Sequence, residues 1–258
     1  MTEITAVIIT KNEEQQISRC LDSLKSWVKE IIVIDDGSTD QTVSLAQKAG
    51  AKVIVQTSKG NFDGQRNKGI DEASSSWVFQ MDADEVVPAQ AAQAISDALA
   101  KNQDFVAFTL TRRDFIFGIP LTHIINAPCV KIFRKDKGRY ASHKIHEILK
   151  IDGPIGHIAT IIDHYNIASI SQTLEKYNYY TDVESRVYLE ENPDIQLADL
   201  KKNLMGRTAK LFYKNYIKQK AYKDGIYGLI WAILHGFYIL LHWLKITEGA
   251  INKKRLKP

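Results

Sequence analysis

The sequence predicts an α/β fold, a mostly parallel β-sheet followed by an α-helical C-terminal segment. Three observations predict it. Short β-branched runs alternate with helical stretches between residues 4 and 101, which is typical of βαβ units and a parallel sheet. Polar and acidic residues directly follow three of these runs, at the strand ends where such sheets bind ligands. From Ser171 onward the pattern is helical.

Four buried strands are predicted in the N-terminal part of the chain. Each is a short run rich in apolar residues and bounded by polar ones. The four runs cover residues 4–10, 30–35, 51–57 and 77–81. Two looser runs, at 105–111 and 130–134, predict further strands.

Helices are predicted between these strands. The first carries apolar residues at helical spacing, Gly50 closes the second, and Pro88 opens the last at a favoured first-turn position. The predicted helices cover residues 13–27, 40–48, 65–73 and 88–101.

Charge and cysteine usage limit the class of protein. The formal net charge of the chain is +4. The segment from Lys245 onward has five basic residues and one acidic residue, so its net charge equals that of the whole chain. A nucleic-acid binder normally spreads basic residues over a face or groove, so we expect no nucleic-acid partner. Cys20 and Cys129 lie among apolar residues without CxxC spacing, which predicts buried thiols in a reducing compartment. Because the N-terminus lacks a signal-peptide pattern, we expect a cytoplasmic protein.

Carboxylates gather at two predicted strand ends. Asp82 and Asp84 follow the fourth strand two residues apart, so both can face one hard cation such as Mg²⁺ or Mn²⁺. Asp35 and Asp36 follow the second strand, where helix capping alone does not require two acids. On the helix after the third strand, Arg66 could reach a phosphate or a nucleobase. Taken singly, each motif could equally be a solvated or capping turn.

Other phosphate- and metal-binding classes lack their motifs here. The sequence has no GxxxxGK[ST], and the turn after the first strand, TKNEEQ, has no glycine, which excludes a P-loop and a dinucleotide-binding turn. The acidic spacing after Asp35 does not match an EF-hand. A haloacid-dehalogenase phosphatase would need a downstream acidic pair, which we do not find.

Four motifs in order, ITKNEE, IDDGSTD, QRNKGI and WVFQMDADE, resemble the family 2 glycosyltransferases of the GT-A fold over roughly residues 3–101. Weaker features of the second half resemble the branch of this family that builds lipopolysaccharide core or related surface glycans. That branch resembles β-glucosyltransferases that use UDP-sugars. These features are Phe117-Gly118, Lys131 to Arg134, His146-Glu147, His164 and Asp224-Gly225.

The resemblance implies a division of the chain. Residues 1–168 would form the GT-A domain, with nucleotide-sugar binding in residues 1–101 and the acceptor side in residues 102–168. Residues 169–258 would form a helical C-terminal region. The implied cofactors are a divalent metal, Mn²⁺ or Mg²⁺, and a nucleotide-sugar donor, UDP-sugar by resemblance.

The resemblance also implies roles for single residues. Asp84 would bind the metal, and His164 resembles a late His that completes the metal shell in some GT-A enzymes. A structural or solvated side chain is the alternative for His164, as for His143, His146 and His157. The residues that would contact the donor are Thr10, Asn12 and Glu13 in the nucleoside pocket, Asp36 at the uracil, Arg66 near the base or diphosphate, and Asp82 near the ribose.

Inversion at the anomeric carbon, which the family implies, needs a base for the proton of the acceptor hydroxyl. Many members use an Asp after an acidic neighbour, and the second half has no such pair. Glu147 stands near that place and is the candidate base, with a surface salt-bridge partner as the alternative. Its rivals are Asp114, Asp152 and Asp163.

Residues 226–244 form an apolar run about as long as a membrane-spanning helix. Two histidines and two glycines interrupt it, and the basic KKRLK tail follows. Its Trp and Tyr residues favour the membrane interface, and basic residues are attracted to anionic lipid. We therefore expect an in-plane helix that attaches the enzyme peripherally to the inner face of the cytoplasmic membrane. A buried core helix is the alternative.

Two functional alternatives remain open from the sequence. One is glycosyl transfer to a polyprenyl phosphate, and the other is a non-catalytic nucleotide-sugar-binding protein. The donor sugar, the acceptor, the linkage position and the oligomeric state are not determined by the sequence.

Overall fold

The computed structural model describes residues 2–58, 62–101, 104–124, 126–141, 148–195 and 197–255. Contacts divide the chain into two compact units. Unit 1 comprises Met1–Arg113 and Asn126–Tyr165, and unit 2 comprises Asp114–Ile125 and Asn166–Pro258.

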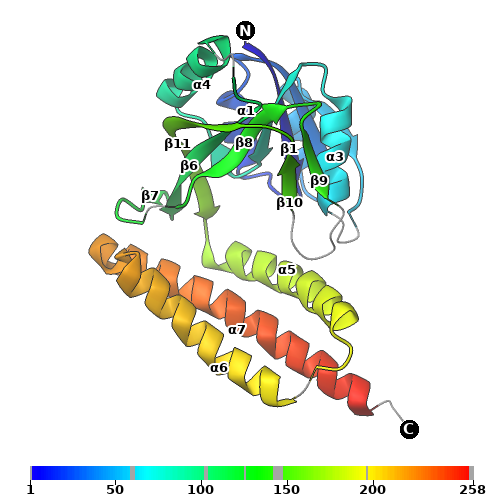
Figure 1. Cartoon of the computed structure of the whole chain (residues 1–258), viewed down its shortest axis with the longest axis vertical. Helices are drawn as coiled ribbons and strands as arrows, with labels where there is room; N and C mark the ends of the chain where they lie inside the picture. Colours follow the sequence, from blue (N-terminus) through cyan, green and yellow to red (C-terminus); the bar gives the residue numbers. More distant parts are fainter. Residues whose placement is uncertain are drawn as a thin grey trace. The chain divides into compact units, whose positions relative to one another are not determined.

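Unit 1 contains the predicted parallel sheet (Figure 1). Strand β1 (Thr2–Thr10) pairs in parallel with β2 (Val28–Asp35) on one side and β4 (Trp77–Asp82) on the other, and β3 (Lys52–Val55) extends the sheet beyond β2. The four strands were predicted. The apolar runs of β1, β2 and β4 are largely buried, as expected for strands covered on both faces, whereas β3 at the edge of the sheet is partly exposed. The register places Thr10 opposite Asp35 and Ile9 opposite Asp82. The polar residues at the strand ends therefore meet at one edge of the sheet.

Four helices were predicted in this part of the chain, and four are present. Helices α1 (Ile17–Asp22), α2 (Thr42–Lys48) and α3 (Phe62–Glu72) connect the parallel strands, and α4 (Ala89–Lys101) follows them in the chain. The first is shorter than the predicted helix over 13–27. It ends where the Ser23 hydroxyl donates to the Cys20 carbonyl at 2.7 Å, and Val28 pairs with Thr2 as the first residue of β2. Val28 is therefore a buried residue of a strand and not of a helix.

The sheet continues from β4 in the order β8-β6-β11-β5, and β8 is antiparallel to both β4 and β6. Strand β5 pairs antiparallel with β11, β7 pairs with β6, and β9 and β10 form a separate hairpin. The sequence predicted β6 and β8 but none of the others. The bounds are β5 (Glu85–Val86), β6 (Ala107–Ile116), β7 (Ile119–Pro120), β8 (Cys129–Arg134), β9 (Gly138–Ala141), β10 (Ile148–Ile151) and β11 (Ile155–Ile167).

Unit 2 is built mainly from helices α5 (Ile170–Glu191), α6 (Leu197–Tyr213) and α7 (Gly225–Arg255) (Figure 1). A π-helical turn, Lys214–Lys218, and a 3₁₀ turn, Ala221–Asp224, join α6 to α7. Helix α7 buries Trp231 and Ala232 near its start and Trp243 and Ile246 further along. By length and composition, the helical stretch Ala221–Lys253 could cross a membrane, and these two properties alone are weak evidence of a membrane span. A third of its most apolar 18-residue window is buried within the protein.

Candidate active site

The Asp82-Ala83-Asp84 turn lies between two strands at the edge where the parallel strands end. β4 ends at Asp82 and β5 begins at Glu85, while Ala83 is 4% exposed and anchors the turn in the core. The Asp82 amide donates to Glu85 Oε2 at 3.0 Å, and the Tyr165 amide donates to the Asp84 carbonyl at 2.8 Å. The turn is therefore fixed by one hydrogen bond across it and by one from the distant residue Tyr165.

The long strand β11 brings His164 to this turn. Its pairing with β5 places His164 opposite Glu85, and His164 Nε2 lies 3.6 Å from Asp84 Oδ1. The two side chains are 16% and 15% exposed. A carboxylate oxygen and an imidazole nitrogen are both ligand atoms for Mn²⁺, and carboxylate oxygen suits Mg²⁺. In the part of the chain that the structure describes, no group of three or more His, Cys, Asp or Glu residues is placed to hold a metal.

Asp82 has a different environment from Asp84, because cations surround it. Lys131 Nζ lies 3.3 Å from its Oδ2, Arg66 Nη2 lies 3.5 Å from its Oδ1, and Arg112 Nη1 lies 3.8 Å away. Burial acts to raise the pKa of Asp82, but the charges of Lys131, Arg66 and Arg112 overcome it and hold the pKa well below its usual range. The surrounding cations therefore favour the ionised carboxylate of Asp82, which can accept hydrogen bonds.

Beneath this turn lies an ion pair between Lys131 and Glu85. Lys131 Nζ is 2.7 Å from both carboxylate oxygens of Glu85, whose side chain is fully buried. Burial acts to lower the pKa of Lys131, but Asp82 and Glu85 raise it to about 12. Arg112 Nη1 also lies 3.4 Å from Glu85.

The sequence assigned no role to Glu85 or Arg112 and noted Lys131 only within a motif. The signal for Lys131 was present, since it is a charge with two apolar residues on either side in the strand CVKIFR. Glu85 and Arg112 belong to polar stretches of the sequence, and no local pattern distinguishes them from surface charges.

The loops after β1 and β2 are joined by hydrogen bonds. Asn12, in the left-handed region at φ 53, donates its amide to Ser38 Oγ at 2.8 Å and accepts from the Thr39 amide at 2.9 Å. The Glu13 amide donates to Thr42 Oγ1 at 2.8 Å. Asn tolerates the left-handed region better than most residues. Asn12 and Glu13, predicted to line the nucleoside pocket, thus also shape the loops at the strand ends.

Thr10 and Asp36 lie deeper at the same edge. The Asp36 amide donates to the Thr10 carbonyl at 2.8 Å. The Asp36 carboxylate accepts from the amide and the hydroxyl of Ser58 and lies 3.4 Å from Lys11 Nζ. Thr10 Oγ1 is buried and has no hydrogen-bond partner among the described residues. A buried hydroxyl without a partner is costly.

Helix α3 carries Arg66 to the edge of the sheet. The helix packs closely on β1 because residue 69 is glycine, where a Cβ would overlap the side chain of Val7. Asn67 exchanges two hydrogen bonds with the backbone of Tyr140, at 2.9 and 3.0 Å. Arg66 lies over the Tyr140 ring, 5.4 Å from its centroid. The guanidinium is thus held between an aromatic face and Asp82.

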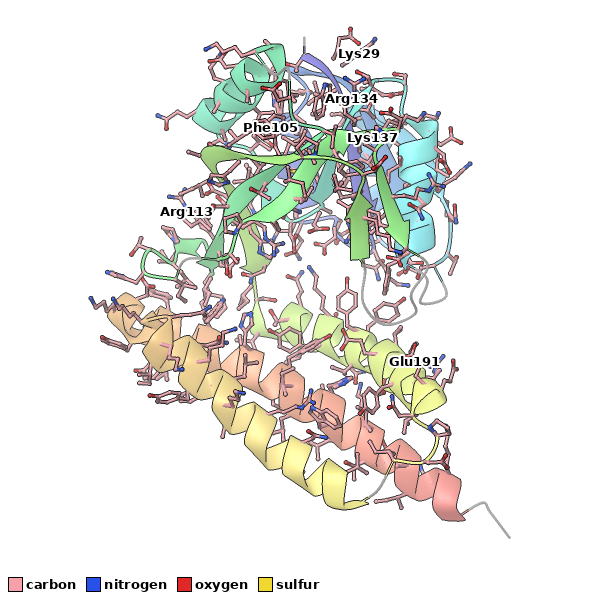
Figure 2. The ribbon with its side chains drawn as sticks, viewed as in Figure 1. Lys29, Phe105, Arg113, Arg134, Lys137 and Glu191 are labelled. Atoms are coloured by element: carbon pink, nitrogen blue, oxygen red, sulfur yellow. The ribbon has the colours of Figure 1, made fainter. Side chains whose placement is uncertain are left out.

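The candidate base Glu147 lies outside the described residues, as do His143 and His146. The three rivals have partners of their own. Asp163 accepts from Arg113 Nε at 3.0 Å and Nη2 at 2.6 Å. The Arg113 side chain is labelled in Figure 2. Asp152 pairs with Lys137 at 2.9 Å, and in unit 2 Asp114 accepts from Trp231 Nε1 at 3.2 Å.

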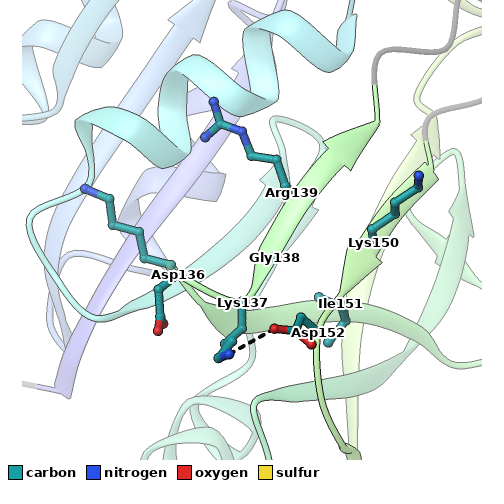
Figure 3. A pocket seen from close by; sticks show the side chains of 8 residues that line it. Asp136, Lys137, Gly138, Arg139, Lys150, Ile151 and Asp152 are labelled. Atoms are coloured by element: carbon teal, nitrogen blue, oxygen red, sulfur yellow. Dashed lines mark hydrogen bonds and ion pairs between the residues drawn. The ribbon is translucent and has the colours of Figure 1, made fainter.

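A cavity of about 400 Å³ beside the β9–β10 hairpin is lined by Lys137 and Asp152 but by no residue around the Asp82-Ala83-Asp84 turn (Figure 3). Its charges are largely paired with one another or with nearby groups. Lys137 pairs with Asp152, Arg139 with Asp71, and Lys135 donates to the carbonyls of Asp71 and Ala73. We therefore do not assign this cavity to the active site.

His157 lies on β11, the same strand as His164. It contacts Thr109 Oγ1 at 2.9 Å, away from the Asp84 turn.

A parallel sheet with acidic and basic side chains gathered at its carboxyl edge, continued by antiparallel strands, is the GT-A fold of nucleotide-sugar-dependent transferases. The chain belongs to glycosyl transferase family 2, whose family model matches residues 5–159. It is therefore a glycosyltransferase enzyme.

Relatives match almost the whole chain. The lipopolysaccharide core biosynthesis glycosyltransferase LpsC of Rhizobium meliloti is 26% identical over 261 residues, covering 98% of this chain and 94% of the relative. A glycosyltransferase of Rickettsia conorii, RC0292, is 26% identical over 270 residues, covering 98% of this chain and 93% of its own. The crystal structure of Staphylococcus aureus TarS 1–349 in complex with UDP-GlcNAc has a TM-score of 0.50 at 14% identity, with 98% and 92% of the two chains covered, a likeness of fold.

Proposed function

We propose that the protein transfers a hexose, glucose by resemblance, from a UDP-sugar to a lipopolysaccharide-core or related cell-surface glycan or glycolipid, by an inverting and metal-assisted reaction. The observation that carries this proposal is the 3.6 Å approach of His164 to Asp84, the second of the paired carboxylates at the end of β4. The near full-length likeness to LpsC supports the acceptor class.

Thr10, Asn12, Glu13 and Asp36 are proposed to hold the nucleoside. Asp36 has the acceptor oxygens needed by a uracil N–H, and the buried Thr10 hydroxyl supplies a further polar atom. Asp82 would accept from a ribose hydroxyl, since the cations around it keep its carboxylate ionised. Arg66 would contact the diphosphate or the base.

Asp84 and His164 are proposed to hold a divalent cation, with diphosphate oxygens and water as the remaining ligands. When bound, Mn²⁺ or Mg²⁺ would stabilise the negative charge that develops on the departing diphosphate. The donor set fits this use, because the protein supplies two ligands and leaves other positions for the substrate. The two aspartates have different neighbours. Asp84 faces a histidine, whereas Asp82 has three cationic side chains within 4 Å.

The acceptor hydroxyl oxygen would attack the anomeric carbon on the face opposite the diphosphate. The bond from that carbon to the diphosphate breaks, which inverts the centre, and the hydroxyl proton moves to a carboxylate base. Glu147 is the proposed base. The contacts of Asp114, Asp152 and Asp163 with Trp231, Lys137 and Arg113 engage each rival in another role.

We further propose that helix α7 attaches the enzyme peripherally to the inner face of the cytoplasmic membrane, where a lipid-anchored acceptor would be met. Four large apolar side chains of α7 remain exposed at 37 to 60%: Ile226, Ile233, Phe237 and Leu244. The helix also buries Trp231, Ala232 and Trp243 in unit 2, contacts that a spanning helix would have to lose. An in-plane helix retains them.

The test is a panel of nucleotide-sugars with Mn²⁺, read as thermal stabilisation and then as transfer. A ligand at a hundred times its dissociation constant adds about 2.7 kcal/mol of stability. We expect a UDP-hexose to stabilise the protein and to be consumed with a lipopolysaccharide-core acceptor. Stabilisation by no UDP-sugar would overturn the donor assignment, and transfer to a polyprenyl phosphate alone would overturn the acceptor.

A further inference from the structure

Positive charge in unit 2 is not confined to the C-terminal tail. Between residues 200 and 244 the sequence has eight Lys and Arg residues and one acidic residue, Asp224. The Asp224 carboxylate accepts from the Thr122 amide and hydroxyl and from His123, and its side chain is 6% exposed. The chain outside the tail is neutral only in sum, because this basic stretch is offset by acidic residues elsewhere.

Five of these basic residues gather around the connection from α6 to α7. All five are exposed, and among the described residues none of their ammonium groups forms an ion pair with a carboxylate. Three of them recur at every fourth position, which places them on one side of the helical segment. The five are Lys210, Lys214, Lys218, Lys220 and Lys223.

Large apolar side chains are exposed between these lysines. Tyr213 is 54% exposed, Ile217 44%, Tyr222 46% and Ile226 60%. Tyr213 and Ile217 are each three positions after a lysine of the same helical segment, so they share its exposed side. We refer to the five lysines and these four residues as the hairpin tip.

The hairpin tip is held by a packed interior. The Phe212 and Tyr216 rings stack with centroids 5.5 Å apart, and Tyr216 meets Tyr222 edge-on at 6.2 Å. Ala221 is fully buried, and a Cβ at residue 228 would overlap its carbonyl oxygen, so glycine is required there. The connection is thus already packed internally, and its outward side chains remain exposed on an ordered framework.

The apolar surface continues from the hairpin tip along α7. Ile226, Ile233, Phe237 and Leu244 are spaced by seven, four and seven residues, which places them on one face of the helix. The hairpin tip and the C-terminal end of the chain lie at opposite ends of α7 (Figure 1). With 31 residues, α7 is about 46 Å long, so an apolar stripe begins at one basic end and runs toward the other.

We propose that the hairpin tip docks on a bilayer surface that contains anionic lipids, with α7 lying along that surface. Tyr residues favour the headgroup region, and exposed lysines are attracted to its negative potential. This inference deepens the proposed membrane attachment: it assigns the principal contact to the hairpin tip, in addition to the C-terminal tail.

The test is co-sedimentation of the full chain with phosphatidylcholine vesicles with and without phosphatidylglycerol. One variant carries Lys214→Gln, Lys218→Gln and Lys223→Gln. The matched control carries Lys48→Gln, Lys101→Gln and Lys150→Gln, which remove the same charge at exposed lysines of unit 1. We expect the first variant to lose affinity for anionic vesicles on the order of a hundredfold, the control to bind like the wild type, and salt to weaken all binding.

A second pair of variants tests the apolar contribution. Tyr213→Ser with Ile226→Ser should weaken vesicle binding, whereas Ile155→Ser with Ile161→Ser, both exposed in unit 1, should not. Circular dichroism and melting confirm that each variant is folded. Equal binding of the two lysine variants to anionic vesicles would overturn the proposal, as would wild-type binding to heparin but to no vesicle.

The outcome is separable from the proposed reaction, because vesicle binding uses neither donor nor acceptor. Lost vesicle binding with unchanged stabilisation by the UDP-sugar supports the docking surface. Vesicle binding that depends on the hairpin tip, without any response to UDP-sugars, would overturn the proposed reaction and leave the docking surface standing.

Discussion

His164 Nε2 lies 3.6 Å from Asp84 Oδ1, although 80 positions separate the two residues in the sequence. The pairing of β11 with β5 makes this approach, since His164 stands opposite Glu85, next to Asp84. The distance is longer than a hydrogen bond, and these two groups are the proposed ligands of a divalent cation. This relationship motivates the first prediction.

Asp84→Ala and His164→Ala are each expected to abolish the Mn²⁺ dependence of UDP binding and to lower turnover by several powers of ten, because a lost metal removes several kcal/mol of transition-state stabilisation. Calorimetric titration of UDP with and without Mn²⁺ measures this. His157→Ala, on the same strand but beside Thr109, is the control and should bind as the wild type does. Full Mn²⁺ dependence in a folded Asp84→Ala variant would disprove the metal role.

Glu147→Gln is expected to lower the transfer rate by about 10²–10⁴-fold while donor binding stays unchanged, because the variant keeps the shape and loses the basicity. Steady-state kinetics with saturating donor measures it. Asp152→Asn serves as the control, since Asp152 pairs with Lys137 at the surface. An unchanged rate in Glu147→Gln would move the base to another carboxylate, with Asp163 next to be tested.

Lys131→Met should destabilise unit 1 by about 3–5 kcal/mol, because it leaves the buried Glu85 carboxylate without its closest cation. Urea unfolding followed by circular dichroism measures the loss. Adding Glu85→Gln to the variant should recover part of it, since the buried charge is then removed. Lys137→Met is the control: its partner Asp152 is 85% exposed, and such surface pairs contribute about 0–1 kcal/mol.

Asp224→Asn should destabilise unit 2 at neutral pH but not in acid. Burial acts to raise the pKa of Asp224, and hydrogen bonds from His123 and Thr122 more than offset this and lower it. A lowered folded-state pKa gives a stabilisation that is complete above the unfolded pKa of about 3.9 and is lost as the pH falls toward the folded value. We expect a difference of about 1–3 kcal/mol at pH 7 that shrinks below pH 4. A difference independent of pH would contradict this account.

Gly228→Ala and Gly206→Ala should change stability in opposite directions. At residue 228 a Cβ overlaps the Ala221 carbonyl, and such overpacking costs about 1–3 kcal/mol. At residue 206, inside α6, a Cβ has open space, so alanine should stabilise by about 0.5–1 kcal/mol through its helix propensity. Thermal melting of both variants measures this, and equal signs would rule out the close approach of the 3₁₀ turn to α7.

The sequence predicted the elements whose signal is local. The four parallel strands are continuous apolar runs, and the residues that follow them lie at one edge because parallel strands end on the same side. The first helix was predicted too long, since Val28 satisfied helical spacing but pairs with Thr2 in the sheet. The strands β9 and β10 are short, and β11 alternates in burial over much of its length. None of the three therefore gives a long continuous apolar run in the sequence.

The sequence by itself determined the fold class, the family resemblance and the acidic turn, because each depends on residue types within a few positions of one another. Only the tertiary structure decided that Lys131, Arg112 and Arg66 surround Asp82 and that Glu85 is buried beneath it. These charges come from separate strands and a helix, and their local sequences do not record which charges will meet. Whether a carboxylate is solvated, neutralised by cations or placed beside a histidine depends on strand pairing between distant segments, and that pairing is a property of the folded chain.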